Sequence, residues 1–376
     1  MAAVKKIKIL QAIRQGKVGG GETHVLDLVK ELDQNRFESI ILSFTDGPMV
    51  EKLKAEGFTT YIVHTEKPFN FNIWKDVKNI IIKENIDIIH AHGTRANSNT
   101  FSSARSLKLP LIYTVHGWSF HPDQNPLVKT VRTLSERFLV KVADKTICVS
   151  KSNLDEGKIR FPMTNSTVIV NGINQIKFNP EQEYKNIRLE FGVSDNVILV
   201  GYIARITAQK DPLNYLRALA MISPDANVKF LIVGDGDMKM KMLSLARDLN
   251  LESRIIFKDF RDDIPDILNA IDIFCLPSLW EGLPIALLEA MAMRKAIVAT
   301  AIDGTKDLVK DRQNGLLIPT SNPEKLAEAI QLLIEDHQLR TNLGIQAGIT
   351  IRENFDIETM TRKIEAIYQN EILNKN

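Results

Sequence analysis

The stretch IKILQAIRQGKVGGGETHVLDLVKEL, residues 7–32, joins an apolar run to an amphipathic segment through three consecutive glycines. The run at 7–13 is typical of a buried strand, and the apolar spacing within 24–32 predicts a helix. A glycine costs about 1 kcal/mol relative to alanine at a helix position. Three glycines at the start of a helix therefore indicate that another group approaches this backbone closely.

The same alternation of strand and helix recurs along the whole chain. Helical spacing is found in segments such as 237–249 and 284–293. Further β-branched runs occupy 38–44, 86–92, 111–117, 145–150, 197–204, 229–234, 254–260, 272–278, 296–300 and 315–319. Such alternation predicts parallel sheets covered by helices on both faces. Because the strands are too many for one compact sheet, we expect two doubly wound Rossmann-like domains.

The boundary between the domains is expected where apolar periodicity lapses, in the polar segment 178–196. We therefore predict an N-terminal domain over 1–180 and a second domain over 181–354. The remaining segment, 355–376, has the pattern of a helix with one exposed face. We expect it to pack back on the first domain.

The composition is that of an ordinary globular protein, with 44% hydrophobic and 25% charged residues in 376. No apolar run approaches the roughly 20 residues that span a bilayer. Cys148 and Cys275 lie in apolar runs, so we expect buried thiols and no disulfide framework. The start of the chain is expected to be a first strand rather than a signal peptide, which predicts a cytoplasmic protein.

Charge is distributed unevenly between the predicted domains. Residues 1–180 hold 25 Lys and Arg against 17 Asp and Glu, whereas the rest of the chain holds 23 against 29. A basic first domain suits phosphate or an anionic membrane surface. A chance distribution of solvated charges is the alternative.

Two segments of the second half place polar groups where a strand meets a helix. Arg205 and Lys210 follow one strand and precede a helix opened by Pro212, which suits a polyphosphate. Glu281 precedes a helix that we expect to begin at Pro284, and Glu289 lies inside that helix. Two carboxylates around a helix N-terminus can hold hydroxyl groups on either side of a phosphate. Solvated surface charges remain an alternative for the first pair.

The segment EGLPIALLEAMA, residues 281–292, resembles the E-x7-E motif of the retaining nucleotide-sugar glycosyltransferases of family 4. Other motifs of that family follow in its order: GGGE at 19–22, HAHG at 90–93, TVHG at 114–117, CVSKS at 148–152, NGIN at 171–174, GYIARITAQKDP at 201–212, IVGDGD at 232–237 and NGLLIP at 314–319. The resemblance covers essentially the whole chain. It implies the GT-B fold, in which two Rossmann-like domains face each other across a cleft.

The resemblance also implies roles for the candidate residues. Glu289 would hold the ribose of the nucleotide and Glu281 the hydroxyls of the donor sugar, while Arg205 and Lys210 would neutralise the leaving diphosphate. Gly282 and Leu283 complete this donor-binding set. The backbone of Gly19, Gly20 and Gly21 would lie against the diphosphate. His116 would orient the reacting sugar and stabilise charge, with a purely structural strand-end histidine as the alternative; lesser candidates are His24, His90 and His92.

The reaction expected from these parts needs no cofactor and no metal. The donor is a nucleotide sugar, with a UDP-sugar favoured over a GDP-sugar, and Asp235-Gly236-Asp237 is expected to be a turn rather than a metal site. The chain departs from the family in two places. AIDGTKDLV carries Asp303 and Gly304 where the family has a sugar-contacting loop. Asp259 stands in the base-contacting segment, so the sequence does not decide which base the donor carries.

We expect transfer to a glycan or lipid-linked acceptor in surface polysaccharide synthesis, and no nucleic-acid partner. The segment 125–145 has apolar residues at helical spacing with basic residues between them, so it suits peripheral contact with the inner face of the plasma membrane. A helix with its apolar face in the core is the alternative. Rival functions are a nucleotide-sugar epimerase of the same fold and a non-catalytic donor-binding subunit.

Overall fold

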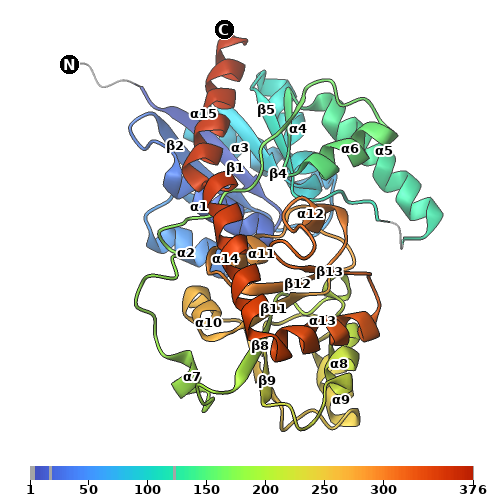
Figure 1. Cartoon of the computed structure of the whole chain (residues 1–376). Helices are drawn as coiled ribbons and strands as arrows, with labels where there is room; N and C mark the ends of the chain where they lie inside the picture. Colours follow the sequence, from blue (N-terminus) through green and yellow to red (C-terminus); the bar gives the residue numbers. More distant parts are fainter. Residues whose placement is uncertain (1–4, 17–18, 122–123, 376) are drawn as a thin grey trace. The chain divides into compact units, whose positions relative to one another are not determined.

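The computed structural model describes residues 5–16, 19–121 and 124–375 (Figure 1). The chain forms two compact units. The first runs to Gly172 and also includes the chain from Ile357 onward, and the second is Ile173–Asp356. Each unit has its own sheet and its own core, so each is described by itself.

The first unit is built on a seven-stranded sheet in the order β3-β2-β1-β4-β5-β6-β7, and its strand pairs are parallel. Its strands are β1 (Ile7–Ile13), β2 (Phe37–Ser43), β3 (Thr60–Ile62), β4 (Ile88–His92), β5 (Leu111–Val115), β6 (Lys145–Cys148) and β7 (Ser166–Val168). Strand β1 pairs with β2 on one side and β4 on the other, so the strand order reverses at this point. Ligands of such sheets bind at the carboxyl ends of the strands beside the reversal.

Helices follow nearly every strand of this sheet. They are α1 (Gly20–Glu31), α2 (Pro48–Ala55), η1 (Phe71–Ile73), α3 (Trp74–Glu84), α4 (Thr94–Leu107), α5 (Pro126–Val142), α6 (Lys151–Arg160) and α15 (Ile357–Leu373). The last helix, at the red end of the chain in Figure 1, buries Ile364 and Tyr368 against Ile9 and Phe37. The final helix is thus part of the first unit's core.

The second unit repeats the plan with six strands in the order β10-β9-β8-β11-β12-β13. The strands are β8 (Ile198–Ile203), β9 (Val228–Val233), β10 (Ile255–Lys258), β11 (Ile273–Leu276), β12 (Ala296–Thr300) and β13 (Leu316–Ile318). The helices are α7 (Ile187–Glu190), η2 (Ala208–Lys210), α8 (Pro212–Met221), α9 (Lys239–Asp248), α10 (Ile264–Ala270), α11 (Ile285–Ala292), α12 (Asp303–Lys306), α13 (Pro323–Glu335) and α14 (His337–Asn354). The reversal of order lies between β8 and β11.

The prediction of two doubly wound parallel sheets is confirmed, and both cysteines are buried as expected. The sequence pattern did not reveal β3 and β7, because each is a three-residue strand with half-buried side chains. The prediction that a helix begins at Pro284 was wrong. Pro284 has an extended conformation and precedes the first residue of α11, Ile285.

Candidate functional site

In the second unit, the loops that follow β8 and β11 carry a buried ion pair. The ammonium of Lys210 contacts Oε1 of Glu281, and both side chains are nearly buried, with 13% and 7% of their surface exposed. Ser278 Oγ donates to the same carboxylate at 2.7 Å, and Gln209 Nε2 lies 3.3 Å from its other oxygen. The predicted residues Lys210 and Glu281 are therefore brought together, with two partners that the motifs did not single out.

Two hydrogen bonds of Gln209 hold these two loops against each other. Its backbone carbonyl accepts from Leu279 N at 2.8 Å, and its side-chain Nε2 donates to Trp280 O at 2.8 Å. The short helix α12 supports them, because a Cβ on Gly304 would lie 2.1 Å from the carbonyl oxygen of Gly282. The AIDGTKD segment, predicted to be an altered sugar-contacting loop, thus packs directly on the Glu281–Gly282 turn.

The other donor-site candidates lie around the same strand ends. Arg205 is half-buried and follows β8, and Leu283 is buried in the turn before α11. Glu289 is the fifth residue of α11 and is half-buried between the buried Leu288 and Ala290. A half-buried carboxylate on this helix can accept hydrogen bonds without the full cost of desolvation.

Asp235 lies in the turn between β9 and α9, as expected from the sequence. Its carboxylate accepts from Gly236 N at 2.9 Å and lies 3.7 Å from the ammonium of Lys239. Gly236 is required there because a Cβ would lie 2.2 Å from the carbonyl oxygen of Ile206. Asp259 follows β10 and also contacts Lys239.

In the first unit, the carboxyl ends of β4 and β5 gather a histidine cluster, defined here as His24, His90, His92 and His116. His92 closes β4, and its Nδ1 lies 3.2 Å from Nε2 of His116, which follows β5. The ring of His24, from α1, packs edge-on against His116 at 4.8 Å between centroids. His90 lies two residues before His92 on β4, and its ring nitrogens contact the hydroxyl groups of Tyr368 and Thr114.

Burial keeps these imidazoles neutral. It lowers the pKa of His24 to about 4, an effect that the neighbouring Asn171 side chain opposes. It also lowers the pKa of His90, His92 and His116 well below the ordinary histidine value, and the mutual repulsion of positive charges within the cluster adds to the effect. A neutral imidazole offers one donor and one acceptor nitrogen.

The glycine turn lies beside this cluster. Gly19 is extended and precedes α1, while Gly20 and Gly21 are the first two helical residues. A Cβ on Gly21 would lie 3.3 Å from Cδ2 of His116, whereas one on Gly20 would meet none of the described residues within 4 Å. His116 therefore approaches Gly21 closely within this unit, while the Cβ position of Gly20 is open among the described residues.

Three of these histidines also form a candidate group of metal ligands. Nitrogens of His24, His92 and His116 lie within 4.8 Å of one another. Metal–nitrogen bonds of about 2.0–2.1 Å allow two ligand nitrogens to be at most about 4.2 Å apart. A separation near 4.8 Å would exceed this limit, whereas Nδ1 of His92 and Nε2 of His116, 3.2 Å apart, lie within it and at a hydrogen-bond distance.

Helix α5 presents an apolar stripe to the outside. Four of its large side chains are 41–74% exposed: Leu127, Val131, Leu134 and Phe138. The alternative that this stripe faces the core is therefore wrong. The opposite face is fixed by Glu136, which is fully buried and accepts from Thr94 Oγ1 at 2.7 Å and Tyr113 Oη at 2.8 Å.

Among the described residues, no helix combines the length and the apolar character that a bilayer crossing requires.

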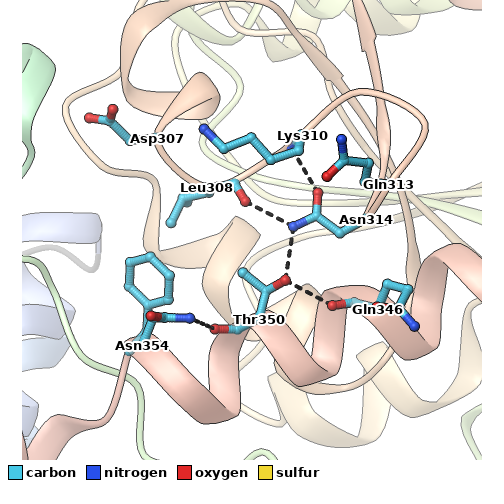
Figure 2. Close-up of a pocket in the computed structure, with 9 residues that line it drawn as sticks. Asp307, Leu308, Lys310, Gln313, Asn314, Gln346, Thr350 and Asn354 are labelled. Atoms are coloured by element: carbon cyan, nitrogen blue, oxygen red, sulfur yellow. Dashed lines mark hydrogen bonds between the residues drawn. The ribbon is translucent and has the colours of Figure 1, made fainter.

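A cavity of about 330 Å³ opens elsewhere in the second unit, between the 307–314 segment and α14 (Figure 2). Polar groups of its lining bond to one another, as Figure 2 shows: Asn314 Nδ2 donates to the backbone carbonyl of Leu308 at 3.1 Å and to Thr350 Oγ1 at 3.0 Å. It contains none of the predicted site residues.

Comparisons with known proteins agree with this architecture. Residues 18–175 match the family described as Glycosyltransferase Family 4, and residues 183–350 match Glycosyl transferases group 1. The UDP-Gal:alpha-D-GlcNAc-diphosphoundecaprenol alpha-1,3-galactosyltransferase of Escherichia coli is 28% identical over 98% of both chains. The N,N'-diacetylbacillosaminyl-diphospho-undecaprenol alpha-1,3-N-acetylgalactosaminyltransferase of Campylobacter jejuni is 30% identical over 86% of this chain and 89% of its own.

Among solved structures, Anabaena HepE in complex with UDP and glucose has a TM-score of 0.86 at 24% identity, covering 97% of this chain and 100% of that one. This likeness shows the fold. Together with the matches across both units, it shows that this chain belongs to the group 1 glycosyltransferases of family 4 and is a glycosyltransferase of GT-B fold.

Proposed function

We propose that the chain is a retaining glycosyltransferase that moves a sugar from a nucleotide diphosphate donor to a lipid-linked glycan acceptor. The observation that carries the proposal is the Lys210–Glu281 pair at the carboxyl ends of β8 and β11, where parallel sheets bind ligands. A cation and a carboxylate at this position suit the two parts of a sugar diphosphate. Other candidate residues would complete such a site.

The charge of each group would decide which part of the donor it binds. Arg205 and Lys210 would neutralise the diphosphate as it leaves, so that the reaction needs no metal ion for this purpose. Lys210 has three donors and can bind a phosphate oxygen while it still contacts Glu281. Glu281 would accept from the sugar hydroxyls, and Glu289 from the ribose.

The first unit would contribute His116 and the backbone of the glycine turn. Because His116 is neutral, it can exchange a hydrogen bond with a sugar hydroxyl without adding a full charge. The open space at Gly20 suits the close approach of a ligand to the backbone. Retention at the anomeric carbon is proposed from the E-x7-E motif, which resembles that of the retaining enzymes of the family.

A UDP-sugar is the proposed donor, because the Escherichia coli relative is named for UDP-Gal and HepE was crystallised with UDP. A lipid-linked acceptor is proposed because both curated relatives are named for diphosphoundecaprenol-linked sugars. Surface polysaccharide assembly is the class of pathway that such an acceptor supports.

Contact with an anionic bilayer is proposed for α5. Its exposed apolar residues lie among Lys129, Arg132, Arg137 and Lys141, and the last three of these are exposed. This combination fits a helix that lies in the interface plane, with apolar side chains among the acyl chains and cations among the headgroups. A protein on the membrane surface would meet a lipid-linked acceptor there.

Calorimetric titration of UDP, GDP and ADP tests the donor site. We expect selective binding of UDP, weakened about 10- to 100-fold in Glu289→Ala because a charge-assisted hydrogen bond is lost. Glu328→Ala is the matched control, since Glu328 is a largely exposed glutamate on α13. Equal binding in all three proteins would contradict the proposed nucleotide site.

Product analysis tests the reaction class. With an α-linked UDP-sugar and a polyprenyl diphosphate sugar, NMR of the anomeric proton is expected to show an α-linked product. A β-linked product would overturn retention. Isomerised donor without any acceptor would indicate an epimerase, and UDP binding without turnover of any donor would indicate a non-catalytic subunit.

A further inference from the structure

A continuous line of hydrogen bonds connects the last helix to His116. Gln11 Nε2, on β1, donates to Tyr368 Oη of α15 at 3.1 Å. Gln11 Oε1 lies 2.9 Å from Nε2 of His92, and Nδ1 of His92 lies 3.2 Å from Nε2 of His116. We call these four residues, Tyr368, Gln11, His92 and His116, the tautomer chain.

The chemistry of the amide gives this line a direction. An amide oxygen can only accept, so Nε2 of His92 must carry the proton that points at Gln11. A neutral imidazole has one proton, so Nδ1 of His92 is an acceptor. Nε2 of His116 must then be the donor in the bond between the two rings. This leaves Nδ1 of His116 as the nitrogen with the lone pair.

Tyr368 holds the amide in the required orientation. Its hydroxyl lies 2.6 Å from Nδ1 of His90, whose Nε2 lies 2.7 Å from Thr114 Oγ1. When the Tyr368 proton is donated to His90, the phenol oxygen can only accept from Gln11, which turns the amide nitrogen toward Tyr368 and the oxygen toward His92. The opposite amide orientation would reverse each bond and put the proton of His116 on Nδ1.

The placement of these polar groups in the core supports a function. Gln11 and His90 are fully buried, and His92 is 1% exposed, on strands whose other buried residues are apolar. Burying polar side chains costs free energy that hydrogen bonds only offset, and aliphatic residues would satisfy the sheet equally well. Of the four residues of the tautomer chain, only His116, at its far end, is half-buried rather than buried.

We propose that Gln11, His92 and Tyr368 are positioning residues that fix the tautomer of His116, so that its Nδ1 accepts a hydrogen bond from a sugar hydroxyl of the substrate. This inference rests on the proposed function, in which His116 contacts the reacting sugar. It adds the direction of that hydrogen bond: the sugar hydroxyl donates, and Nδ1 of His116 accepts. It also makes a residue of the last helix part of the reaction's specificity.

The first test reads the tautomer directly. The full chain labelled with ¹⁵N-histidine is examined by long-range ¹H–¹⁵N correlation at neutral pH, in which protonated and unprotonated ring nitrogens have distinct shifts. His116 is assigned by the loss of its resonances in His116→Gln. We expect a protonated Nε2 and an unprotonated Nδ1 in the wild type. The reverse pattern, or shifts that change on adding Zn²⁺ because the ring binds metal, would overturn the proposal.

The second test breaks the line at its remote end. Tyr368→Phe removes only the hydroxyl, and we expect His116 to become a mixture of tautomers, with kcat lowered about tenfold, the loss of roughly one hydrogen bond. KM for the donor should change less than kcat. Tyr113→Phe is the matched control, because Tyr113 is an equally buried tyrosine of the same unit whose hydroxyl bonds Glu136 instead. It should leave the tautomer unchanged.

Gln11→Met is a second variant that breaks the line if Tyr368→Phe does not fold. An unchanged His116 tautomer in both variants would overturn the positioning role whatever happens to activity. A mixed tautomer with unchanged kcat would overturn the hydrogen bond from substrate to Nδ1. Absence of transfer in the wild type with every donor would be a failure of the proposed function, and the NMR pattern would still decide whether the tautomer chain exists.

Discussion

Gly21, the second residue of α1, faces the imidazole of His116 so closely that a Cβ there would lie 3.3 Å from Cδ2 of the ring. At the neighbouring Gly20, none of the residues that the structure describes lies within 4 Å of the same position. Two adjacent positions of one motif are therefore glycine for different physical reasons. One makes room for a side chain of the same unit, and the other leaves the start of a helix open.

This difference gives a matched pair of substitutions. Alanine at either position gains helix propensity of about 1 kcal/mol. We expect Gly20→Ala to raise the free energy of unfolding by about 0.5–1 kcal/mol, whereas in Gly21→Ala displacement of His116 offsets this gain and lowers kcat. Urea unfolding and steady-state kinetics check both. Equal stability of the two variants would contradict the contact between Gly21 and His116.

Removing one partner of the Lys210–Glu281 pair should destabilise the second unit. Breaking a buried pair by removing one partner typically costs about 3–5 kcal/mol, because the other charge stays buried and unpaired. We expect Glu281→Ala to have a cost of about 3 kcal/mol and the double variant Lys210→Met/Glu281→Ala to cost less than the sum of the single variants. A double-mutant cycle by urea unfolding measures the coupling; additive costs would show that the two charges do not depend on each other.

The histidine cluster predicts a loss of stability in mild acid. In the unfolded chain a histidine has a pKa of about 6.5, whereas burial lowers that of His24 to about 4. Below pH of about 6.5 the unfolded state therefore binds more protons than the folded state, so the free energy of unfolding falls as pH falls. The stabilisation is fully present above the unfolded pKa.

For His24 alone the loss is about 1.4 kcal/mol per pH unit across this window, up to about 3 kcal/mol near its lower end. His24→Gln cannot bind this proton, so its unfolding free energy should fall less steeply between pH of about 6.5 and about 4.5. Urea unfolding of both proteins across this range checks the slope. Parallel curves would show that His24 does not contribute to the acid sensitivity.

Binding of α5 to membranes is tested with vesicles. We expect the chain to cosediment with vesicles that contain phosphatidylglycerol more than with pure phosphatidylcholine, and less so at high salt. Leu127→Ser/Leu134→Ser should weaken binding about tenfold or more for each leucine removed from the acyl region. The control is Leu189→Ser/Met240→Ser, which removes two exposed apolar residues of other helices. Equal loss in the two double variants would contradict a specific role for α5.

Much of the fold could be predicted from the sequence because its determinants are local. Strands such as IKILQAI and AIVAT are short β-branched runs, and their period differs from that of the amphipathic helices. The three-residue strands β3 and β7 escaped this pattern. They are held in place by pairing with a neighbouring strand, which a local pattern does not record.

The candidate site was only partly predictable. The motifs singled out Lys210, Glu281 and His116, yet gave no reason to add Gln209 and Ser278, which contact Glu281. Gln11 offered one indication, since it is a polar residue inside an apolar run. Tyr368 offered none, because its partner is 357 positions away.

The sequence by itself determined the strand–helix alternation, the two sheets and the strand ends at which chemistry is expected, since period, apolarity and glycine content are properties of neighbouring residues. Only the tertiary structure decided which side chains meet. The strand order places β1 beside β4, and α15 packs on the same sheet, so Gln11, His92 and Tyr368 share one buried line of hydrogen bonds. That line depends on packing between distant segments, because hydrogen bonds form between groups that are close in space, whatever their separation along the chain.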